Sequence, residues 1–358
     1  MIGKGSFGKV HLGIHILSKK KVAIKCIDKT YIKEEKAQKK IVQEVKILRS
    51  LTHRNIIKIL EVFENKKFVF IVTDYACRGD LLKYMKENGV FKEHRAKPVI
   101  AQTLRALEYC HSKGILHRDV KLDNILLDKD MQVKLCDFGV SRFMTDEKIK
   151  ERCGTPAYIA PEVISGNGYS HFQADIWSLG VLLYALTTGT IPFKAKNIPD
   201  LHKLILKSDF DFPDGVDLSS SFKALVRLML LKDPDQRITI EEIWAHPWLE
   251  QVLHMRTKPT QTPDIDPFVL EQVLLKMEKL GFPMDKFTIS KKLSVSLLEL
   301  LITKYSEYLV FSEKVITLLN SIPSRLAQRH SNGLVPATLE KQIGLQSHID
   351  SSLTLVPK

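Results

Sequence analysis

The chain has 358 residues, of which 44% are hydrophobic and 27% are charged, and its formal net charge is +13 at pH 7. These proportions are typical of a soluble globular protein and exclude a fibrous and a largely disordered chain. A chain of this length accommodates two or three cooperating units rather than one core.

The excess of positive charge has two interpretations. A concentrated basic surface binds nucleic acid or an anionic surface, whereas lysines spread over solvated faces are an ordinary feature of protein surfaces. The sequence contains no tandem basic and aromatic blocks, which favours the second interpretation. We therefore expect no specific nucleic-acid partner.

Neither the cysteines nor the apolar segments point to secretion or to a membrane. The five cysteines show no Cys-x-x-Cys pairing and no zinc spacing, and they suit a reducing compartment. The N-terminus lacks a signal-peptide pattern, and the longest apolar run, near residues 179–186, is too short for a membrane span. The expected location is the cytoplasm, with entry into the nucleus left open.

The first residues combine a glycine-rich string with a strand pattern. Gly3, Gly5 and Gly8 fit the pattern Gly-x-Gly-x-x-Gly-x-Val. Glycines let the backbone approach phosphate groups and present N–H groups to them, but a dinucleotide-binding unit uses a similar string. Such a unit would continue into a helix, whereas the following residues alternate like strands up to Lys25. The pattern therefore predicts a hairpin capped by the glycine loop.

Lys25 ends an apolar strand, and a buried lysine needs an acidic partner. Residues 34–49 carry apolar side chains at helical spacing, and Glu44 lies next to this apolar stripe. A Lys25–Glu44 pair would orient the ammonium group toward phosphates. A solvated glutamate on a charged helix is the alternative for Glu44 taken alone.

The remaining patterns divide the chain into a β-rich part and a helical part. Strand-like runs at residues 56–63 and 68–72 complete a small sheet, and a change of polarity around Gly79 indicates a hinge. Helical patterns then follow at residues 81–86, 96–112, 179–188 and 222–231.

The string His-Arg-Asp-Val-Lys-Leu-Asp-Asn at residues 117–124 carries the chemistry. Asp119 supplies a carboxylate that accepts a hydroxyl proton, Lys121 a cation, and Asn124 an amide oxygen for a metal ion. A polar loop after a helix would be an equal explanation if nothing else matched. Asp137-Phe138-Gly139 follows, however, and this second motif decides in favour of phosphoryl transfer.

Together these motifs resemble the eukaryotic protein kinases over residues 2 to about 249, in the calcium/calmodulin-dependent group and closest to the AMP-activated protein kinase relatives. Further matching elements are Ala160-Pro161-Glu162, Asp175-Ile176-Trp177-Ser178-Leu179-Gly180 and Arg237. The resemblance implies that Arg237 pairs with Glu162. Lys121 and the segment 154–158 are similar to the serine/threonine branch. The resemblance implies an α+β, bilobal fold in residues 1–249, with a small β-rich N-lobe (1–73), a hinge (74–78) and a larger α-helical C-lobe (79–249).

The resemblance also implies the role of each site residue. Lys25, Glu44, Asp119 and Lys121 would be catalytic, and Asn124 and Asp137 would hold Mg²⁺. ATP would contact the glycine loop and the residues around it, namely Ile2, Gly3, Lys4, Gly5, Ser6, Phe7, Gly8, Lys9, Val10, Ala23, Lys25, Asp74, Ala76 and Leu126. Asp80 and Asp123 complete the binding set, where they would contact a basic residue upstream of the acceptor. The partners would be protein substrates with Ser or Thr acceptors.

The C-terminal part follows a linker at residues 250–267. Residues 268–309 resemble the ubiquitin-associated-like helical module that relatives of AMP-activated protein kinase carry, and any docked helix pair is the alternative. This module implies regulatory subunits or an intramolecular contact. Residues 310–358 stay unassigned.

Two features depart from the family pattern. Most of the strand before the glycine loop is missing, because the sequence is truncated or because the sheet edge is shortened, and we expect weaker ATP binding from a less tethered loop. Glu151 occupies the position of the activating phosphothreonine, and its carboxylate would stand in for the phosphate by pairing with Arg118, Arg142 and Lys40. A solvated glutamate is the equal alternative.

Three functions remain in competition at this point. The favoured one is an active serine/threonine kinase. A nucleotide-binding pseudokinase or scaffold would require the loss of the lysine, the aspartate or the asparagine, and none is lost. Nucleic-acid binding is supported only by the net charge, and the salt dependence of retention on nucleic acid would reveal it.

Overall fold

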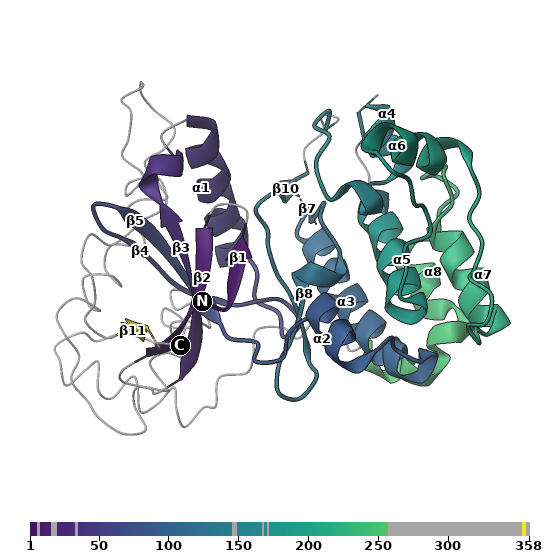
Figure 1. The fold of residues 1–358 in the computed structure, drawn as a ribbon, viewed down its shortest axis with the longest axis horizontal. Helices are drawn as coiled ribbons and strands as arrows, with labels where there is room; N and C mark the ends of the chain where they lie inside the picture. The colour runs from purple at the N-terminus through teal and green to yellow at the C-terminus, as the bar shows by residue number, and fades with distance from the viewer. Residues whose placement is uncertain are drawn as a thin grey trace, which may run out of the picture.

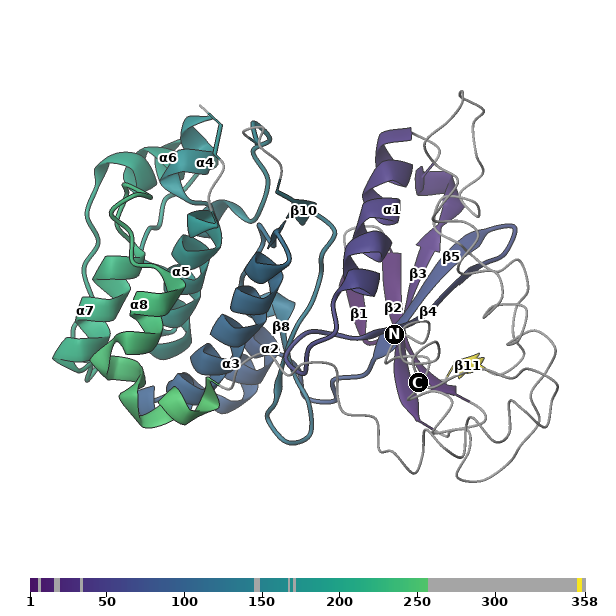
Figure 2. The same ribbon diagram turned by 180° about the vertical axis from the view of Figure 1, so that it is seen from behind.

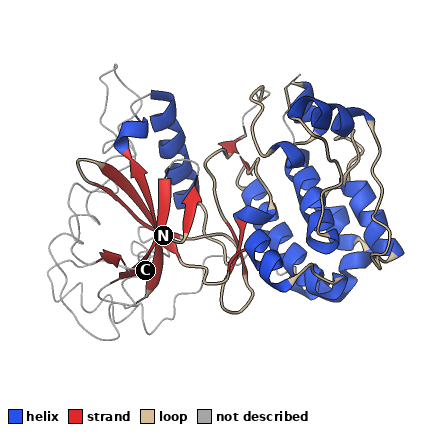
Figure 3. Ribbon diagram, viewed as in Figure 1, coloured by secondary structure: helices blue, strands red, loops and turns tan. Residues whose placement is uncertain are grey.

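The computed structural model describes residues 1–5, 8–15, 20–32, 35–144, 149–166, 168–169, 172–256 and 353–355. Within these residues the chain forms a β-rich N-lobe and a helical C-lobe, which lie side by side (Figure 1 and Figure 3). This arrangement confirms the predicted bilobal α+β fold. In the described part of the chain, no helix is both long and apolar enough to cross a membrane.

The N-lobe is built on an antiparallel sheet in the order β1-β2-β3-β5-β4. Its strands are β1 (Gly3–Gly5), β2 (Gly8–His15), β3 (Lys21–Asp28), β4 (Ile59–Glu64) and β5 (Phe68–Asp74), and β11 (Leu353–Leu355) pairs with β2. Alternation of apolar side chains along β3 and β5 buries Ile27 and Val69 on one face and Val22 and Val72 on the other. The predicted hairpin of β2 and β3 is confirmed.

The predicted strand at residues 56–63 is shorter than expected. Strand β4 begins at Ile59, because the preceding residues pair with the C-lobe instead. The N–H of Ile57 donates to the carbonyl oxygen of Leu135 at 2.9 Å, and the N–H of Leu135 donates to that of Asn55 at 2.8 Å. This exchange ties the base of the N-lobe to the strand that leads to Asp137.

Helix α1 (Glu35–Ser50) follows the short helix η1 (Lys29–Ile32) and matches the predicted helix within one residue. Its apolar stripe of Ile41, Val45 and Leu48 is buried, so burial of one face stabilises the helix. Helix α1 lies on the side of the N-lobe that faces the C-lobe (Figure 1 and Figure 2).

The C-lobe consists of helices packed around α5, in which nearly every residue is buried. The helices are α2 (Leu81–Asn88), α3 (Glu93–Ser112), α4 (Pro161–Ser165), α5 (Gln173–Thr188), α6 (Ile198–Lys207), α7 (Ser220–Met229), α8 (Ile240–Ala245) and η4 (Pro247–Met255). Four were predicted, and α5 begins six residues earlier than expected, at Gln173. Its first turns contain polar residues that are buried, and an apolar pattern does not detect these.

Short strands between the lobes flank residues 117–124, which we call the catalytic loop after its proposed role. Strands β6 (Gly79–Asp80), β8 (Ile125–Leu127) and β9 (Val133–Leu135) form one antiparallel sheet, and β7 (Ile115–Leu116) pairs with β10 (Arg142–Phe143). The 117–124 string lies between β7 and β8, and its end forms the short helix η2 (Leu122–Asn124). These pairings fix the chain on both sides of the catalytic loop.

The predicted helical module at residues 268–309 lies outside the described residues. The same is true of the linker beyond residue 256 and of most of the unassigned tail. All five cysteines are described, and all are free thiols.

Candidate active site

The backbone of the catalytic loop is fixed by Asp175, near the start of α5. Its carboxylate accepts hydrogen bonds from the N–H groups of His117 at 2.9 Å and Arg118 at 2.8 Å, and it contacts Nε2 of His111 at 2.8 Å. Burial disfavours the charged carboxylate and by itself would raise the pKa of Asp175. The hydrogen bond and charge of His111, together with the interactions with His117, outweigh burial, so this pKa lies below its usual value. This anchor holds Arg118 at a φ of 70°, a conformation that is strained for a non-glycine residue.

Asp119 lies at the centre of the site with both carboxylate oxygens engaged. Oδ1 accepts from the N–H and the hydroxyl of Thr155 at 3.0 and 2.8 Å, and Oδ2 lies 2.7 Å from the Lys121 ammonium. Burial alone would raise the pKa of Asp119, but hydrogen bonds from Lys121 and Thr155 outweigh it, so this pKa is lowered. The carboxylate is therefore ionised at neutral pH and can accept a proton.

Thr155 is a contact that the sequence did not assign. Besides the two bonds to Asp119, its hydroxyl accepts a hydrogen bond from Lys121 Nζ at 2.8 Å. Thr155 therefore links the acid and the cation of the catalytic loop. Its place in the Gly154–Tyr158 motif was visible in the sequence. The contact itself depends on how the chain runs between Asp137 and Glu162, which we call the activation segment.

Asn124 and Asp137 present the oxygen ligands that Mg²⁺ prefers. The Asn124 amide nitrogen donates to the backbone oxygen of Asp119 at 2.8 Å and to its Oδ2 at 2.9 Å, which leaves the amide oxygen for a cation. Asp137 follows β9 with a φ of 62°, and its Oδ1 accepts from the N–H of Gly139 at 3.3 Å. The two donors fit a hard divalent cation.

Lys25 on β3 and Glu44 on α1 form the predicted ion pair, with Nζ 2.6 Å from Oε1. Burial disfavours the ammonium, but the carboxylates of Glu44 and Asp137 outweigh it, and the pKa of Lys25 is raised. A Cβ at Gly139 would lie 3.1 Å from Asp137 Oδ1 and 3.6 Å from Glu44 Oε2. The N-lobe pair and the Asp137 motif therefore meet at this glycine.

The expected adenine contacts come from both lobes. Val10 and Ala23 are half-buried on β2 and β3, while Leu126 is half-buried on β8. Ile2 is largely exposed, and its N–H donates to the Val10 carbonyl oxygen at 2.8 Å. On the hinge side, Ala76 is buried.

The glycine loop is described only in part. Ser6 and Phe7 lie outside the described residues, whereas the backbone of Gly3, Lys4 and Gly5 pairs with β2. At Gly8 the structure gives a different reason for glycine than the one we expected. A Cβ at Gly8 would overlap the carbonyl oxygen of Cys26 on β3, so close packing of the two strands requires glycine there.

Glu151 contacts two of its three expected partners. Its Oε2 lies 3.3 Å from an Arg118 nitrogen and 3.8 Å from an Arg142 nitrogen. Among the described ion pairs none joins Lys40 to Glu151, so the expectation for Lys40 is wrong. The Arg118 side chain is 6% exposed and that of Glu151 is 56% exposed, so the carboxylate reaches a buried cation from the surface.

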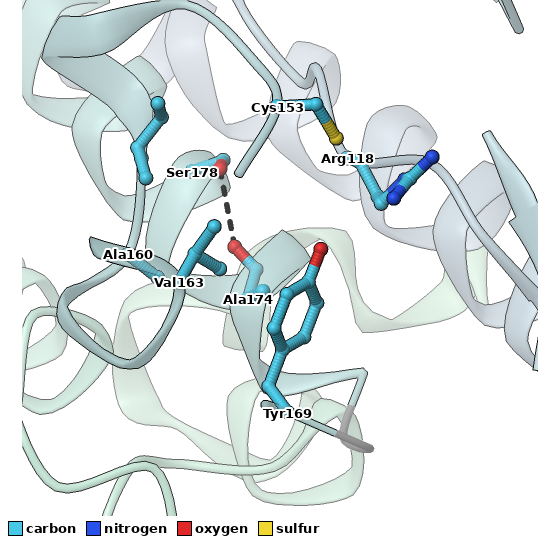
Figure 4. Close-up of a pocket in the computed structure, with 8 residues that line it drawn as sticks. Arg118, Cys153, Ala160, Val163, Tyr169, Ala174 and Ser178 are labelled. Atoms are coloured by element: carbon cyan, nitrogen blue, oxygen red, sulfur yellow. Dashed lines mark hydrogen bonds between the residues drawn. The ribbon is translucent and has the colours of Figure 1, made fainter. Parts of the chain in front are cut away.

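A small pocket lies behind this contact, between the activation segment and α5 (Figure 4). Arg118, Cys153, Tyr169 and Ser178 are among its lining residues, and its volume is about 10 Å³. This volume holds about one water molecule. Neither Lys25 nor Asp137 lines the pocket, and the pocket is too small for a nucleotide.

A buried ion pair ties the end of the activation segment to the C-lobe. Arg237 donates to both carboxylate oxygens of Glu162 at 2.7 and 2.9 Å and also to the carbonyl oxygens of Leu231 and Gln173. This bidentate geometry is the pairing that the sequence predicted for Arg237.

Comparison with known proteins gives the class of this chain. The family described as "Protein kinase domain" matches residues 1–249, and the chain belongs to this family.

Individual relatives show which protein kinases this chain is similar to. Serine/threonine-protein kinase SIK1 of Mus musculus is 42% identical over 267 residues, which are 74% of this chain and 33% of the relative. SNF1-related protein kinase catalytic subunit alpha KIN12 of Arabidopsis thaliana is 39% identical over 284 residues, 78% of this chain and 57% of the relative. Serine/threonine-protein kinase SIK2 of Gallus gallus is 40% identical over 287 residues, 78% of this chain and 36% of the relative. The chain thus spans between a third and little more than half of these relatives.

Proposed function

We propose that this chain is a serine/threonine protein kinase that transfers the γ-phosphate of Mg-ATP to Ser and Thr hydroxyls of protein substrates. The observation that carries the proposal is the Asp119 carboxylate, which is held by contacts with Lys121, Thr155 and Asn124. The names of the relatives, which are serine/threonine kinases, support the same reaction.

Each residue has a defined task in this reaction. When bound, Mg-ATP supplies the phosphoryl group and the divalent charge that neutralises its oxygens. Asp119 orients the acceptor hydroxyl and takes its proton, while Lys121, 2.7 Å from Asp119, stabilises negative charge that develops on the transferred group. Lys25, oriented by Glu44, binds the α- and β-phosphates. Asn124 and Asp137 would hold the metal ion through oxygen atoms.

The replacement Asp119→Asn tests this assignment. It keeps the size of the side chain and removes the proton acceptor, so we expect phosphoryl transfer to fall by about 10²- to 10⁴-fold. Nucleotide affinity, measured by calorimetry, should stay within about twofold, because Asp119 contacts the acceptor rather than ATP. Loss of nucleotide affinity with transfer preserved would rule out this role for Asp119.

A pseudokinase that binds nucleotide and serves as a scaffold is the alternative. It predicts nucleotide binding by the wild type without any transfer. The presence of Lys25, Asp119, Asn124 and Asp137, joined by the contacts described above, favours the active enzyme.

The substrates are proposed to carry a basic residue upstream of the acceptor. Asp80 lies just past the hinge on β6, and Asp123 is exposed on the catalytic loop. Charge-assisted contacts from these carboxylates to an Arg or Lys of the substrate are worth about 1–3 kcal/mol.

Asp80 also has a structural task, so its replacement must be chosen with care. Its Oδ1 accepts from the N–H of Lys83 at 2.7 Å and caps helix α2. Asp80→Asn keeps this acceptor and removes the charge. In a peptide library we expect the upstream preference to weaken about tenfold, whereas Glu87→Gln, exposed on the same helix, should leave it unchanged. An unchanged preference in Asp80→Asn would contradict the proposal.

A further inference from the structure

The first residues of the activation segment, 140–143, lie between helix α1 and the catalytic loop, and we call them the junction segment. Gln43, the neighbour of Glu44 on α1, donates from Nε2 to the backbone oxygen of Ser141 at 2.7 Å. One turn later, Lys46 Nζ lies 5.5 Å from the centre of the Phe143 ring. Helix α1 thus contacts the junction segment at two points.

The same segment is bound from the other side by the catalytic loop. Ser141 is 2% exposed, and its hydroxyl donates to the His117 carbonyl oxygen at 3.0 Å. Arg118 Nε donates to the Val140 carbonyl oxygen at 2.5 Å, and β10 pairs with β7 just before the loop. Ser141 therefore receives a hydrogen bond from α1 and gives one to the residue that begins the catalytic string.

We propose that Gln43 is a positioning residue, which couples the placement of helix α1, and so the Lys25–Glu44 pair, to the conformation of the catalytic loop through Ser141. The expected effect of Gln43 on the rate of phosphoryl transfer rests on the proposed kinase function. The structural effect does not: α1 and the junction segment are held in place together or released together.

The hydrogen bond of Gln43 is better suited to this coupling than the other contacts nearby. Lys46 is exposed, and a cation–π contact at an exposed site is weak. Glu44 Oε2 is buried without a hydrogen-bond partner, so this atom does not hold α1 in place. Gln43 instead binds a main-chain carbonyl of a buried residue, whose position depends little on side-chain rotamers.

Three replacements of Gln43 separate the hydrogen bond from the bulk of the side chain. Gln43→Leu removes the donor at similar size, and Gln43→Glu places an acceptor against the Ser141 carbonyl oxygen. Gln43→Lys restores a donor of sufficient length. The matched control is Lys39→Leu on the same helix, whose side chain is 72% exposed.

The first measurement is amide hydrogen exchange in the protein without nucleotide. The N–H of Ser141 bonds to the Phe138 oxygen at 3.1 Å, and the N–H of Met144 bonds to the Gly114 oxygen at 2.7 Å. We expect peptides that contain these amides to exchange about five- to tenfold faster in Gln43→Leu and Gln43→Glu. Gln43→Lys and Lys39→Leu should resemble the wild type.

The second measurement is steady-state transfer to a serine peptide. We expect kcat to fall about five- to tenfold in Gln43→Leu and Gln43→Glu with little change in the KM for the peptide, and to recover in Gln43→Lys. Faster exchange confined to α1, or a Gln43→Lys variant that behaves like Gln43→Leu, would overturn the inference. If the wild type transfers no phosphate, the proposed function is wrong, and the exchange result alone decides on Gln43.

Discussion

Glu151 places a negative charge in the activation segment that does not depend on phosphorylation. Its carboxylate lies 3.3 Å from the buried Arg118 and 3.8 Å from Arg142. Arg118 precedes Asp119 directly, so the pair connects the activation segment to the proposed proton acceptor. A carboxylate brings one charge where a phosphate brings nearly two, and we therefore expect it to hold the segment more weakly than a phosphate would.

The replacement Glu151→Gln tests this stand-in role. Exposed ion pairs contribute about 0–1 kcal/mol, so we expect the unphosphorylated variant to lose about two- to fivefold in kcat/KM. Glu151→Thr should show the same loss, and phosphorylation of that threonine should reverse it.

The control for this experiment is Asp130→Asn, which removes a charge from another exposed pair. Full activity of Glu151→Gln would show that the carboxylate is merely solvated. A wild type that stays inactive until it is phosphorylated elsewhere would contradict the stand-in role equally.

The site residues differed in how far the sequence could predict their contacts. The Lys25–Glu44 pair was predictable, because a lysine within an apolar strand needs an acidic partner and the following helix carries Glu44 next to its apolar stripe. The absent Lys40–Glu151 pair and the contacts of Thr155 and Gln43 were not. They depend on the path of the activation segment, which no local pattern determines.

At the scale of elements, the Arg237–Glu162 pair joins the end of the activation segment to the chain between α7 and α8. The Arg237 side chain is fully buried, and its guanidinium lies 5.2 Å from the centre of the Trp177 ring on α5. Removing one partner of a buried pair leaves the other charge uncompensated, which costs more than the pair itself contributes.

We expect Glu162→Gln and Arg237→Met each to lower the free energy of unfolding by about 3–5 kcal/mol. Urea denaturation measures this change. Lys39→Leu, which removes the exposed pair with Glu35, should lower it by less than about 0.5 kcal/mol. A loss below about 1 kcal/mol at Arg237 would mean that the pair is not needed for stability.

Element boundaries were predicted less well than element types. The helical period identified α1, α2, α3, α5 and α7, but it missed the polar first turns of α3 and α5. Glu93 at the start of α3 accepts hydrogen bonds from Ser219 and Trp248, which are distant in sequence. Residues 56 and 57 were predicted as the start of a strand, but Ile56 forms a bridge with Leu135 of the C-lobe instead. Such long-range pairings are not encoded in local periodicity.

At the scale of the whole molecule, buried charges make stability depend on pH. The pKa values of Asp175 and Asp119 are lower in the folded chain than their usual values. The two carboxylates therefore contribute fully to the stability of the fold above the pKa of an unfolded Asp, about 3.9. This contribution is lost as the pH falls through their pKa values in the folded chain. Lys25 has a raised pKa, so its contribution is present at neutral pH and is lost only in strongly alkaline solution.

The replacement Asp175→Asn measures the acid side of this dependence. Urea denaturation between pH 3 and 6 should show the unfolding free energy of the wild type falling toward low pH, with a shallower slope for Asp175→Asn. The variant should also be less stable than the wild type at pH 6, because the hydrogen bonds of the carboxylate are weakened. Equal slopes for the two proteins would contradict a lowered pKa at Asp175.

The C-terminal residues add a proposal at this scale. The predicted ubiquitin-associated-like module at residues 268–309 lies outside the described residues and beyond residues 1–249, which the kinase family matches. We propose that the module regulates the kinase domain through an intramolecular contact or a regulatory subunit.

Phosphoryl transfer to a free hydroxyl is the direct test of the proposed kinase activity. Three peptides should be compared that share an upstream arginine and differ only in a Ser, Thr or Tyr acceptor. With Mg-ATP and the wild-type chain, without an upstream kinase, we predict phosphorylated Ser and Thr peptides by mass spectrometry. The Tyr peptide and a sample with excess chelator should remain unmodified. Nucleotide binding without transfer to any of the three peptides would contradict the account.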